Sequence, residues 1–317
     1  MTLRLSVDRT AWDAHVDAVA TAVGPRLVPV VKGNGYGLTR RWLAGRAAAL
    51  SSRVAVGTVW EAADVPAGCE PLVLTPALHL PDDLRSDAVF TVGADAHVDV
   101  LRRHGFAGRV VVKLRSSMGR YGAGRGQVSS LADAAGRAGL EVGGFALHLP
   151  IAGTDDDRLA EIEQWLDHLP AGAPLAVSHL EPRAFDALVR RHPERPWSLR
   201  LGTWLWHGDK SALHLEADVV DRRAIASGAT AGYRLGTADS GGDLLLIGAG
   251  TAHGVTPLPD GRSPFHFARR RLPLHEAPHM HTSMVVVGDG EPVPEVGDWV
   301  DVQRPLTAIV ADVVDWT

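Results

Sequence analysis

The three lysines are the side chains of this sequence best suited to chemistry. The 317-residue chain holds 32 Lys and Arg residues, of which only Lys32, Lys113 and Lys210 are lysines. A lysine can lose its proton and then act as a nucleophile or a base, whereas an arginine stays charged at every useful pH. In a chain this rich in arginine, the remaining lysines are candidates for work that arginine cannot do.

Lys32 has the most suggestive surroundings. It follows the apolar run Leu27–Val31 and precedes the glycine-rich stretch 33–37. Glycine lets a backbone approach a ligand closely, and a partly desolvated amine at the end of a strand can form a Schiff base with a carbonyl group. The same pattern also suits an ordinary surface lysine that ends a strand.

Short apolar, β-branched runs recur through the first two thirds of the chain, with stretches of helical spacing between them. This alternation predicts βα units around a parallel sheet. Eight strands fit a (β/α)8 TIM-type barrel, whose active sites lie at the C-terminal ends of the strands. A doubly wound open sheet is the alternative, disfavoured because no glycine-rich dinucleotide fingerprint follows the first strand. The expected strands are 27–31, 54–59, 71–75, 88–92, 109–114, 144–149, 175–180 and 198–205, and the clearest helices are 95–104, 128–138, 157–168 and 181–191.

The composition and residue pattern of the sequence change after Gly208. The remainder is rich in Val, Gly, Pro and Thr, and its alternating runs are broken by Asp-Gly and Gly-Asp turns. This pattern predicts a mostly antiparallel β domain. We expect a barrel over residues 10–208 and a C-terminal β domain over 209–317, which residues 1–9 would join through a strand near Leu3–Asp8.

Composition excludes several classes of protein. The net charge is −5 and no basic run exceeds three residues, so we expect no nucleic-acid partner. No apolar run approaches the roughly 20 residues of a membrane span, and the N-terminus lacks the pattern of a secretory signal. A single cysteine, Cys69, cannot form an intrachain disulfide. These features predict a cytoplasmic protein without membrane partners.

The nonamer VVKGNGYGL at residues 30–38 resembles the signature around the cofactor lysine of the alanine racemase family, which consists of fold type III enzymes dependent on pyridoxal 5'-phosphate. The resemblance implies a barrel that binds this cofactor, with a C-terminal β domain. It also implies that Lys32 carries the cofactor covalently and that Tyr36 contacts its phosphate.

A second segment, residues 112–122, is similar to the family stretch in which a lysine and then Met-Gly-Arg lie near the substrate. The resemblance implies that Arg120 binds the substrate carboxylate and the phenolic oxygen of the cofactor. Lys113 matches a lysine that is carbamylated in some relatives, or it serves to orient Arg120. Where the family has Asp-Thr-Gly, residues 115–117 are Arg-Ser-Ser, so an acidic residue is missing.

Three further matches concern the cofactor. The strand that ends in His148 resembles the one that places a histidine beside the pyridine ring. Arg200 matches the arginine at the pyridine nitrogen, and the backbone amides of Gly202 and Thr203 match those that hold phosphate, as anion capture by backbone N–H groups allows. Ser178 lies where the family has a phosphate-binding serine, although its surroundings, VSHLEP, differ from the usual Asn-Ser.

The C-terminal domain contributes two residues through the same resemblance. Tyr233 matches the second catalytic base, which reaches the partner's active site in a head-to-tail homodimer. Met280 matches the methionine whose backbone amide touches the substrate carboxylate. The chain departs from the family where Thr251 and His253 replace an entrance tyrosine and aspartate, where His281 replaces an aspartate, and where no tyrosine follows Tyr233.

Together these matches predict a cytoplasmic amino-acid racemase, an isomerase that interconverts the L and D forms of a small amino acid with Lys32 and the partner's Tyr233 as its two bases. One alternative is an epimerase or lyase of another amino acid, like D-threonine aldolase or D-serine dehydratase. Such lyases use a metal, and His275, His279 and His281 suit one; without an evident Cys or Asp co-ligand we expect none. A catalytically silent cofactor-binding protein is the other alternative, and the substrate stays open.

Overall fold

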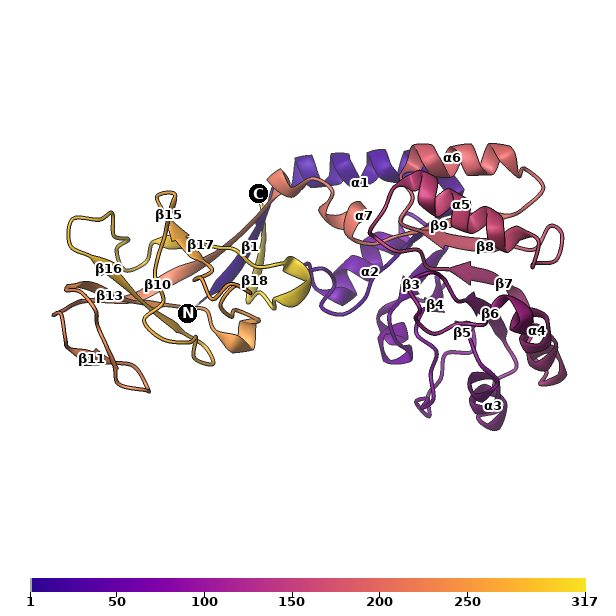
Figure 1. The fold of residues 1–317 in the computed structure, drawn as a ribbon, viewed down its shortest axis with the longest axis horizontal. Coiled ribbons are helices and arrows are strands. Elements are labelled where there is room, and N and C mark those ends of the chain that lie inside the picture. The colour runs from indigo at the N-terminus through magenta and orange to yellow at the C-terminus, as the bar shows by residue number, and fades with distance from the viewer. Residues whose placement is uncertain (1) are drawn as a thin grey trace. The chain divides into compact units, whose positions relative to one another are not determined.

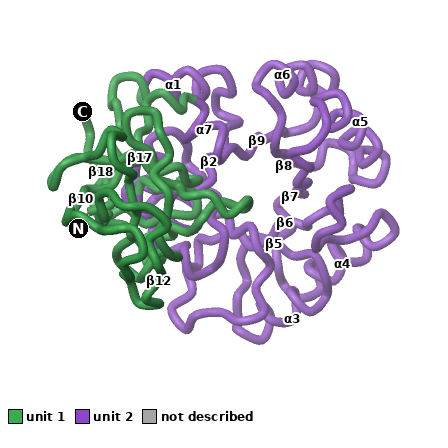
Figure 2. The backbone as a smooth tube through the Cα atoms, turned by 60° about the vertical axis from the view of Figure 1, so that its left-hand side comes forward, with its two compact units in different colours: residues 1–13, 36–38, 209–317 green, residues 14–35, 39–208 purple. Residues whose placement is uncertain are grey.

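The computed structural model describes residues 2–317, which fall into two compact units (Figure 2). One unit contains residues 14–35 and 39–208. The other contains the N-terminal segment up to Asp13, residues 36–38 and residues 209–317. The helix α1 (Arg9–Val23) contributes residues to both units.

The first unit is a barrel of eight parallel strands, and the labels from β2 through β9, β8, β7 and β6 to β5 follow an arc in Figure 2. An isolated parallel bridge between Val30 and Ala55 joins the first strand to the last and closes the ring. The predicted parallel barrel is therefore confirmed. The strand order is β2 (Leu27–Pro29), β9 (Trp197–Leu201), β8 (Leu175–Ser178), β7 (Glu141–Leu147), β6 (Arg109–Leu114), β5 (Val89–Val92), β4 (Glu70–Val73) and β3 (Arg53–Val56).

Branched and small apolar side chains fill the barrel. Burial of each larger one contributes about 1.5–3 kcal/mol, and the mixture of Val with Ala lets opposite strands pack closely. The cluster consists of Val28, Val30, Ala55, Leu72, Val89, Val111, Ala146 and Ala176.

Helices follow most of the strands. The helix α5 begins at a capping box, in which Thr154 accepts a bond from the Asp157 N–H, and α6 begins with a proline in its first turn. The four helices that the spacing predicted all form. The helices after α1 are α2 (Arg40–Ala48), α3 (Asp95–Arg103), α4 (Val128–Arg137), α5 (Asp155–Leu166), α6 (Pro182–Arg191) and α7 (Thr203–His207), shown in Figure 1.

The last predicted strand, 198–205, is wrong at its end. The strand β9 stops at Leu201, and the short helix α7 follows. The apolar side chains Leu205 and Trp206 are buried from this helix, and the Trp206 indole donates to the Val30 carbonyl at 2.8 Å. Short apolar runs suit a buried helix as well as a strand, so periodicity alone could not separate the two.

The second unit is mostly antiparallel, as predicted, with β1 (Leu3–Val7) paired antiparallel to β10 (Leu213–Ile225) and parallel to β18 (Val313–Trp316). The N-terminal strand thus belongs to the C-terminal sheet. A register shift between Val219 and Asp221 lets β10 also pair with β13. The other strands are β11 (Thr230–Ala231), β12 (Gly236–Thr237), β13 (Gly242–Ile247), β14 (Phe265–Phe267), β15 (Arg270–Arg271), β16 (Ser283–Gly288) and β17 (Trp299–Val302).

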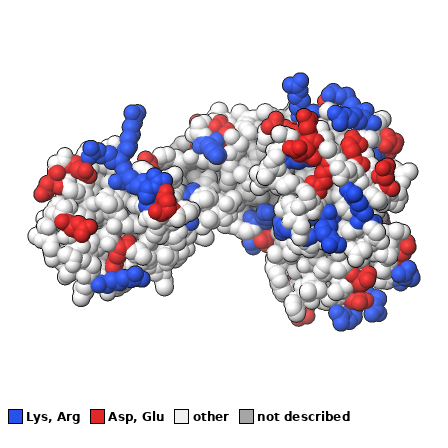
Figure 3. Space-filling view, in the orientation of Figure 1, with Lys and Arg blue, Asp and Glu red and all other residues white. Residues whose placement is uncertain are grey.

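Surface charge is mixed. Acidic and basic side chains are interspersed over the face drawn in Figure 3. Among the helices of residues 2–317, none has the length and apolar character needed to cross a bilayer.

Candidate active site

Polar side chains gather at the C-terminal ends of the barrel strands. Lys32 follows β2, Lys113 lies near the end of β6, and His148 follows β7 directly. Ser178 is the last residue of β8, and Arg200 lies in β9. Because parallel strands present their C-terminal ends at the same end of a barrel, the fold brings these five predicted residues together.

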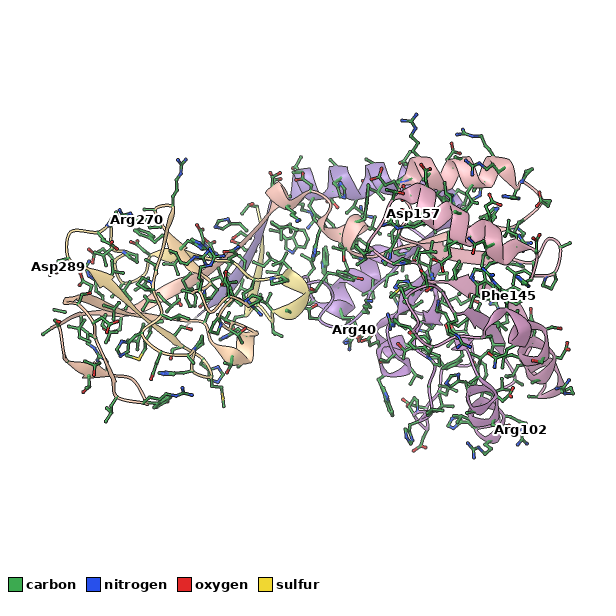
Figure 4. The ribbon with its side chains drawn as sticks, viewed as in Figure 1. Arg40, Arg102, Phe145, Asp157, Arg270 and Asp289 are labelled. Atoms are coloured by element: carbon green, nitrogen blue, oxygen red, sulfur yellow. The ribbon has the colours of Figure 1, made fainter. Side chains whose placement is uncertain are left out.

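The loop that carries Lys32 is held by two side chains that the sequence analysis did not single out. Glu61 accepts the Gly33 N–H at 3.0 Å. Arg40, labelled in Figure 4, donates to the Gly33 carbonyl at 2.9 Å and also pairs with Asp64. The sequence signal for Glu61 is the capping box that it forms with Thr58.

The Lys32 amine has no hydrogen-bond or ion-pair partner within residues 2–317, and its side chain is accessible to solvent. Burial of part of the side chain lowers the pKa of the amine, the charge of Arg120 lowers it further, and Glu61 acts in the opposite direction. A lower pKa enlarges the neutral fraction, which is the nucleophilic form. The surroundings of Lys32 therefore suit the attack of an amine on a carbonyl.

Lys113 is almost completely buried, with 5% of its surface exposed. Its amine donates to the carbonyls of Leu114 at 3.3 Å and Ala146 at 3.5 Å. Burial, followed by the charges of Arg200 and Arg120, lowers the pKa of Lys113 to about 6. The amine is therefore largely neutral at neutral pH, when it can hold or release a proton but pairs weakly with an anion.

Replacing Lys113 by Met should stabilise the protein by about 1–4 kcal/mol at pH 7, since an apolar side chain carries no cost of losing a proton or burying a charge. Between about pH 6 and 10.5 the unfolded chain binds this proton and the folded chain does not. Wild-type stability thus rises with pH, and the advantage of Lys113→Met shrinks towards pH 10.5. Urea denaturation across this range measures it; the control is Lys210→Met, at an exposed lysine, and a constant difference would contradict the buried amine.

Arg200 is as buried as Lys113, with 5% of its surface exposed. Its Nη2 donates to the Leu147 carbonyl at 2.7 Å, while its Nε is buried without a hydrogen-bond partner. Burial lowers its pKa to about 10, so the guanidinium stays charged at neutral pH. A buried donor without a partner costs about 1–3 kcal/mol, and a ligand that supplied an acceptor would remove that cost.

His148 and Ser178 form a hydrogen-bonded pair. The Ser178 hydroxyl lies 2.9 Å from Nδ1 of His148 and accepts the Leu149 N–H at 3.2 Å. Burial, with Arg200 next, lowers the pKa of His148 to about 2, so the ring is neutral at ordinary pH. The ring centroid of His179, which the sequence analysis passed over, lies 4.7 Å from that of His148, and Nδ1 of His179 lies 2.7 Å from the Leu149 carbonyl oxygen.

We expect Ser178→Ala to lower the free energy of unfolding by about 1–2 kcal/mol, because the buried Leu149 N–H loses its acceptor and the His148 nitrogen its partner. Chemical denaturation in urea measures the loss. Ser130→Ala is the matched control, since the Ser130 hydroxyl bonds the Gln127 carbonyl at an exposed position. Equal stability of the two variants would show that the Ser178 pair contributes nothing.

Arg120 lies on an exposed loop after β6. Its guanidinium carbon is 5.0 Å from the centroid of the Tyr121 ring, and Nη2 is 3.4 Å from the Tyr121 hydroxyl. In residues 115–117, where the chain differs from the family pattern, both the N–H and the hydroxyl of Ser117 donate to Glu161 at 2.7 Å. A small cavity of about 10 Å³ lies here, lined by Lys113, Ser116, Met118, Arg120, Tyr121 and His148.

A larger cleft of about 640 Å³ lies between this loop and α5. It shares Ser116 with the small cavity but contains no lysine or histidine. Asp157, labelled in Figure 4, lies on its α5 side. Lys113 and His148 line the small cavity and not the larger cleft.

The remaining predicted barrel residues lie at turns. Gly202 precedes α7 and Thr203 begins it, and the first N–H groups of a helix have no partner inside it. Tyr36 is buried, with a left-handed φ of 57°, and groups with the β unit.

Tyr233 and Met280 belong to the β unit and not to the barrel. Tyr233 lies in the turn between β11 and β12 and is 85% exposed. Met280 is 66% exposed, and its N–H donates to no group within residues 2–317. Of the replaced entrance residues, His253 is buried, with Nε2 3.2 Å from Asp312 and its ring 5.9 Å from that of His281.

The three histidines considered for a metal have different partners. His275 lies 3.1 Å from the Ala231 carbonyl, His279 is paired with Glu276, and His281 lies beside His253. In the part of the chain that the structure describes, no group of three or more His, Cys, Asp and Glu side chains is arranged to hold a metal ion.

Solved alanine racemases share this architecture over nearly the whole chain. The enzyme from Bartonella henselae, solved with covalently bound pyridoxal phosphate, has a TM-score of 0.75 at 18% identity, covering 99% of both chains. The biosynthetic enzyme from Pseudomonas aeruginosa has a TM-score of 0.69 at 19% identity, covering 99% of this chain and 98% of that one. The enzyme from Bacillus anthracis has a TM-score of 0.70 at 19% identity, covering 95% and 85%.

No curated protein matches the chain by sequence, and at these identities the solved structures show the fold. A family model described as the N-terminal domain of alanine racemase matches residues 7–182, which is more than half of the chain. With its parallel barrel and mostly antiparallel β domain, this protein belongs to the alanine racemase family.

Proposed function

We propose that this protein is a racemase of a small amino acid that depends on pyridoxal 5'-phosphate. The observation that carries the proposal is the Lys32 amine, which has no partner within residues 2–317 and whose pKa is lowered at the end of the barrel where Arg200 and His148 also lie. An amine in this state is ready to form an imine with an aldehyde.

The residues present fit this cofactor. The unpartnered Nε of Arg200 would gain an acceptor in a pyridine nitrogen, and the neutral ring of His148 suits a place beside an aromatic ring. Lys32 would hold the aldehyde carbon. Tyr36, Ser178 and the amides of Gly202 and Thr203 would hold the phosphate, as the family resemblance implies.

The cofactor supplies an electron sink that acidifies the substrate Cα–H. The protein must then move protons on two faces of a planar centre, which requires one acid–base group on each face. We assign Lys32 to one face and the partner's Tyr233 to the other. Arg120 would hold the substrate carboxylate through charge-assisted bonds, and the Met280 N–H would reach it from the partner subunit.

Arg200 has a further consequence in this scheme. With a pKa of about 10, it keeps its proton at neutral pH and does not pass it to the ring nitrogen. Arg200 would thus leave the ring nitrogen of a bound cofactor unprotonated, a state that would disfavour side reactions such as transamination. Arg200 thus favours return of the proton to Cα.

A homodimer with shared sites accounts for the exposure of Tyr233 and Met280. Both are large side chains, exposed by 85% and 66% in the single chain, so a partner subunit can reach them. We propose a head-to-tail homodimer that acts in the cytoplasm, a compartment that suits a chain with one cysteine.

Borohydride trapping tests the cofactor assignment. Protein reconstituted with pyridoxal 5'-phosphate is reduced and digested, and the peptides are mapped by mass spectrometry. We expect the pyridoxyl group on Lys32. A label on Lys113, or no label, would overturn the assignment.

A deuterium-exchange screen tests the reaction. Each common amino acid, in both enantiomers, is incubated in deuterated water, and the products are analysed for Cα label and chirality. We expect label and inversion with a small amino acid. Cofactor absorbance without Cα exchange on any amino acid would instead indicate a catalytically silent cofactor-binding protein.

A lyase or epimerase acting on another amino acid is the second candidate. It is favoured by His253 and His281, which replace acidic residues of the family pattern and lie beside each other in the β unit. Carbonyl products, or activity that requires an added divalent metal, would select this candidate over the racemase.

A further inference from the structure

The turn that carries Tyr233 is too small to hold its own shape. It connects β11 and β12, which have two residues each, and one backbone bond closes it, from the Leu235 N–H to the Gly232 carbonyl at 3.2 Å. An isolated two-stranded hairpin is marginal in water. Contacts from elsewhere in the β unit must therefore fix the position of Tyr233.

Glu276 supplies the first of these contacts. One carboxylate oxygen accepts the Tyr233 N–H at 2.9 Å, and the other accepts the Arg234 N–H at 3.1 Å. Only 7% of this side chain is exposed. Hydrogen bonds to an ionised, shielded carboxylate are roughly twice as strong as neutral ones, so Glu276 fixes the backbone of the turn on both sides of the Tyr233 Cα.

His279 supplies the second contact. Its Nε2 is bonded to the same Glu276 carboxylate, and its ring lies against the ring of Tyr233, with centroids 4.3 Å apart and planes inclined by 39°. Aromatic pairs in this range contribute about 0.5–1.5 kcal/mol beyond burial. The ring of Tyr233 is thus held on one face, while its hydroxyl has no hydrogen-bond partner within residues 2–317.

The arrangement depends on Gly232. Its φ is +81°, and a Cβ at this position would come within 2.1 Å of Oε1 of Glu276. A side chain here would displace the carboxylate, so the backbone and Glu276 are fitted to each other. Burial alone would raise the pKa of Glu276, but its bonds from His279, Tyr233 and Arg234 outweigh burial and lower the pKa, so the group is an anion at neutral pH.

We propose that Glu276 and His279 are positioning residues that hold the Tyr233 hydroxyl in the place and direction from which it exchanges a proton with substrate in the partner's site. This inference rests on the proposed role of Tyr233 as the second base. It assigns a task to two residues that touch neither substrate nor cofactor. A shift of about 1 Å in a catalytic group costs on the order of 10²-fold in rate.

The principal test is Glu276→Gln in the full-length holoenzyme, with Glu291→Gln as the matched control, since Glu291 pairs with Arg270 at the surface of the same unit. We expect Glu276→Gln to slow Cα deuterium exchange by about 10- to 100-fold for the enantiomer that Tyr233→Phe slows. Exchange of the opposite enantiomer should stay within about twofold. In a Tyr233→Phe background, Glu276→Gln should cost no more than about twofold further, because coupled residues are not additive.

A second readout does not depend on turnover. The chain has three tyrosines, so labelling with ring-13C tyrosine gives a spectrum in which Tyr233→Phe identifies the Tyr233 signal. We expect that signal to shift in Glu276→Gln and in His279→Ala, with or without cofactor, while the Tyr36 and Tyr121 signals stay in place. His279→Phe keeps a stacked ring and should restore part of the exchange rate that His279→Ala loses.

The outcomes separate the two levels of the argument. If Tyr233→Phe is selective for one enantiomer and Glu276→Gln has no effect, the positioning role is wrong and the proposed function stands. If Tyr233→Phe has no selective effect, the two-base function is wrong, and an unmoved Tyr233 signal in Glu276→Gln would overturn the positioning role as well. Should Glu276→Gln fail to fold, the His279 variants carry the same comparison.

Discussion

Lys32→Ala should lose at least about 10³-fold of its racemase turnover, because the change removes both the nucleophile for the cofactor and the proton carrier on one face. The visible absorbance of the bound cofactor should disappear with it. No other amine replaces Lys32, since the Lys113 amine is buried and directed at backbone carbonyls. Steady-state kinetics and an absorbance spectrum of the reconstituted protein measure both losses.

The matched control is Lys210→Ala, at an exposed lysine in the short 3-10 helix Lys210–Ala212. This variant should keep wild-type turnover and absorbance. Methylamine added to Lys32→Ala should restore some exchange, since a free amine can replace the missing one in part. A Lys32→Ala protein that still takes up the borohydride label would contradict the assignment.

Tyr233→Phe should slow proton exchange by about 10²- to 10⁴-fold on one face of the substrate. The ring is retained, so its stacking on His279 survives and the loss reflects the hydroxyl alone. Exchange that starts from the opposite enantiomer uses Lys32 and should continue. Nuclear magnetic resonance of each enantiomer in deuterated water measures the two rates separately, and an equal loss for both would count against the scheme.

Mixing the two inactive variants gives a sharper result. If each site takes Lys32 from one subunit and Tyr233 from the other, a hybrid dimer of Lys32→Ala with Tyr233→Phe has one site with both changes and one intact site. After unfolding and refolding together, random pairing should restore about a quarter of wild-type activity. A mixture as inactive as its components would show that the sites are not shared.

Much of the barrel could be predicted because each strand is a short run of apolar, β-branched residues that are adjacent in the sequence. The strand Arg109–Leu114 forms at its predicted bounds, since a run of β-branched residues between polar ends suits a buried strand. Lys32 could be singled out from its place after an apolar run and before a glycine-rich turn, whereas His148 and Arg200 were assigned through the family resemblance of their segments. The end of β9 was predicted wrongly because a short apolar run such as that around Trp204 suits a buried helix as well as a strand.

The groups that support the site could not be read in this way. Glu276 accepts the N–H of Tyr233, which lies 43 residues earlier in the sequence. Glu61 accepts the N–H of Gly33, in the Lys32 loop, which lies 28 residues earlier. His179 became visible through its ring contact with His148. An acidic residue or histidine at a turn is common in any sequence, and only the fold shows which backbone groups it meets.

The way the barrel closes beside Lys32 determines where the native state opens locally. Three residue pairs join β2 to β9. Within residues 2–317, one bridge, between Val30 and Ala55, joins the end of β2 to β3, and there the Val31 N–H donates to the Ala55 carbonyl at 2.7 Å. Segments with few protected amides are the first to open in the native state. The Val31 amide hydrogen should therefore exchange early with solvent when the cofactor is absent. A cofactor bound to Lys32, the next residue, would stabilise the junction of this side of the barrel with β3 and slow that exchange.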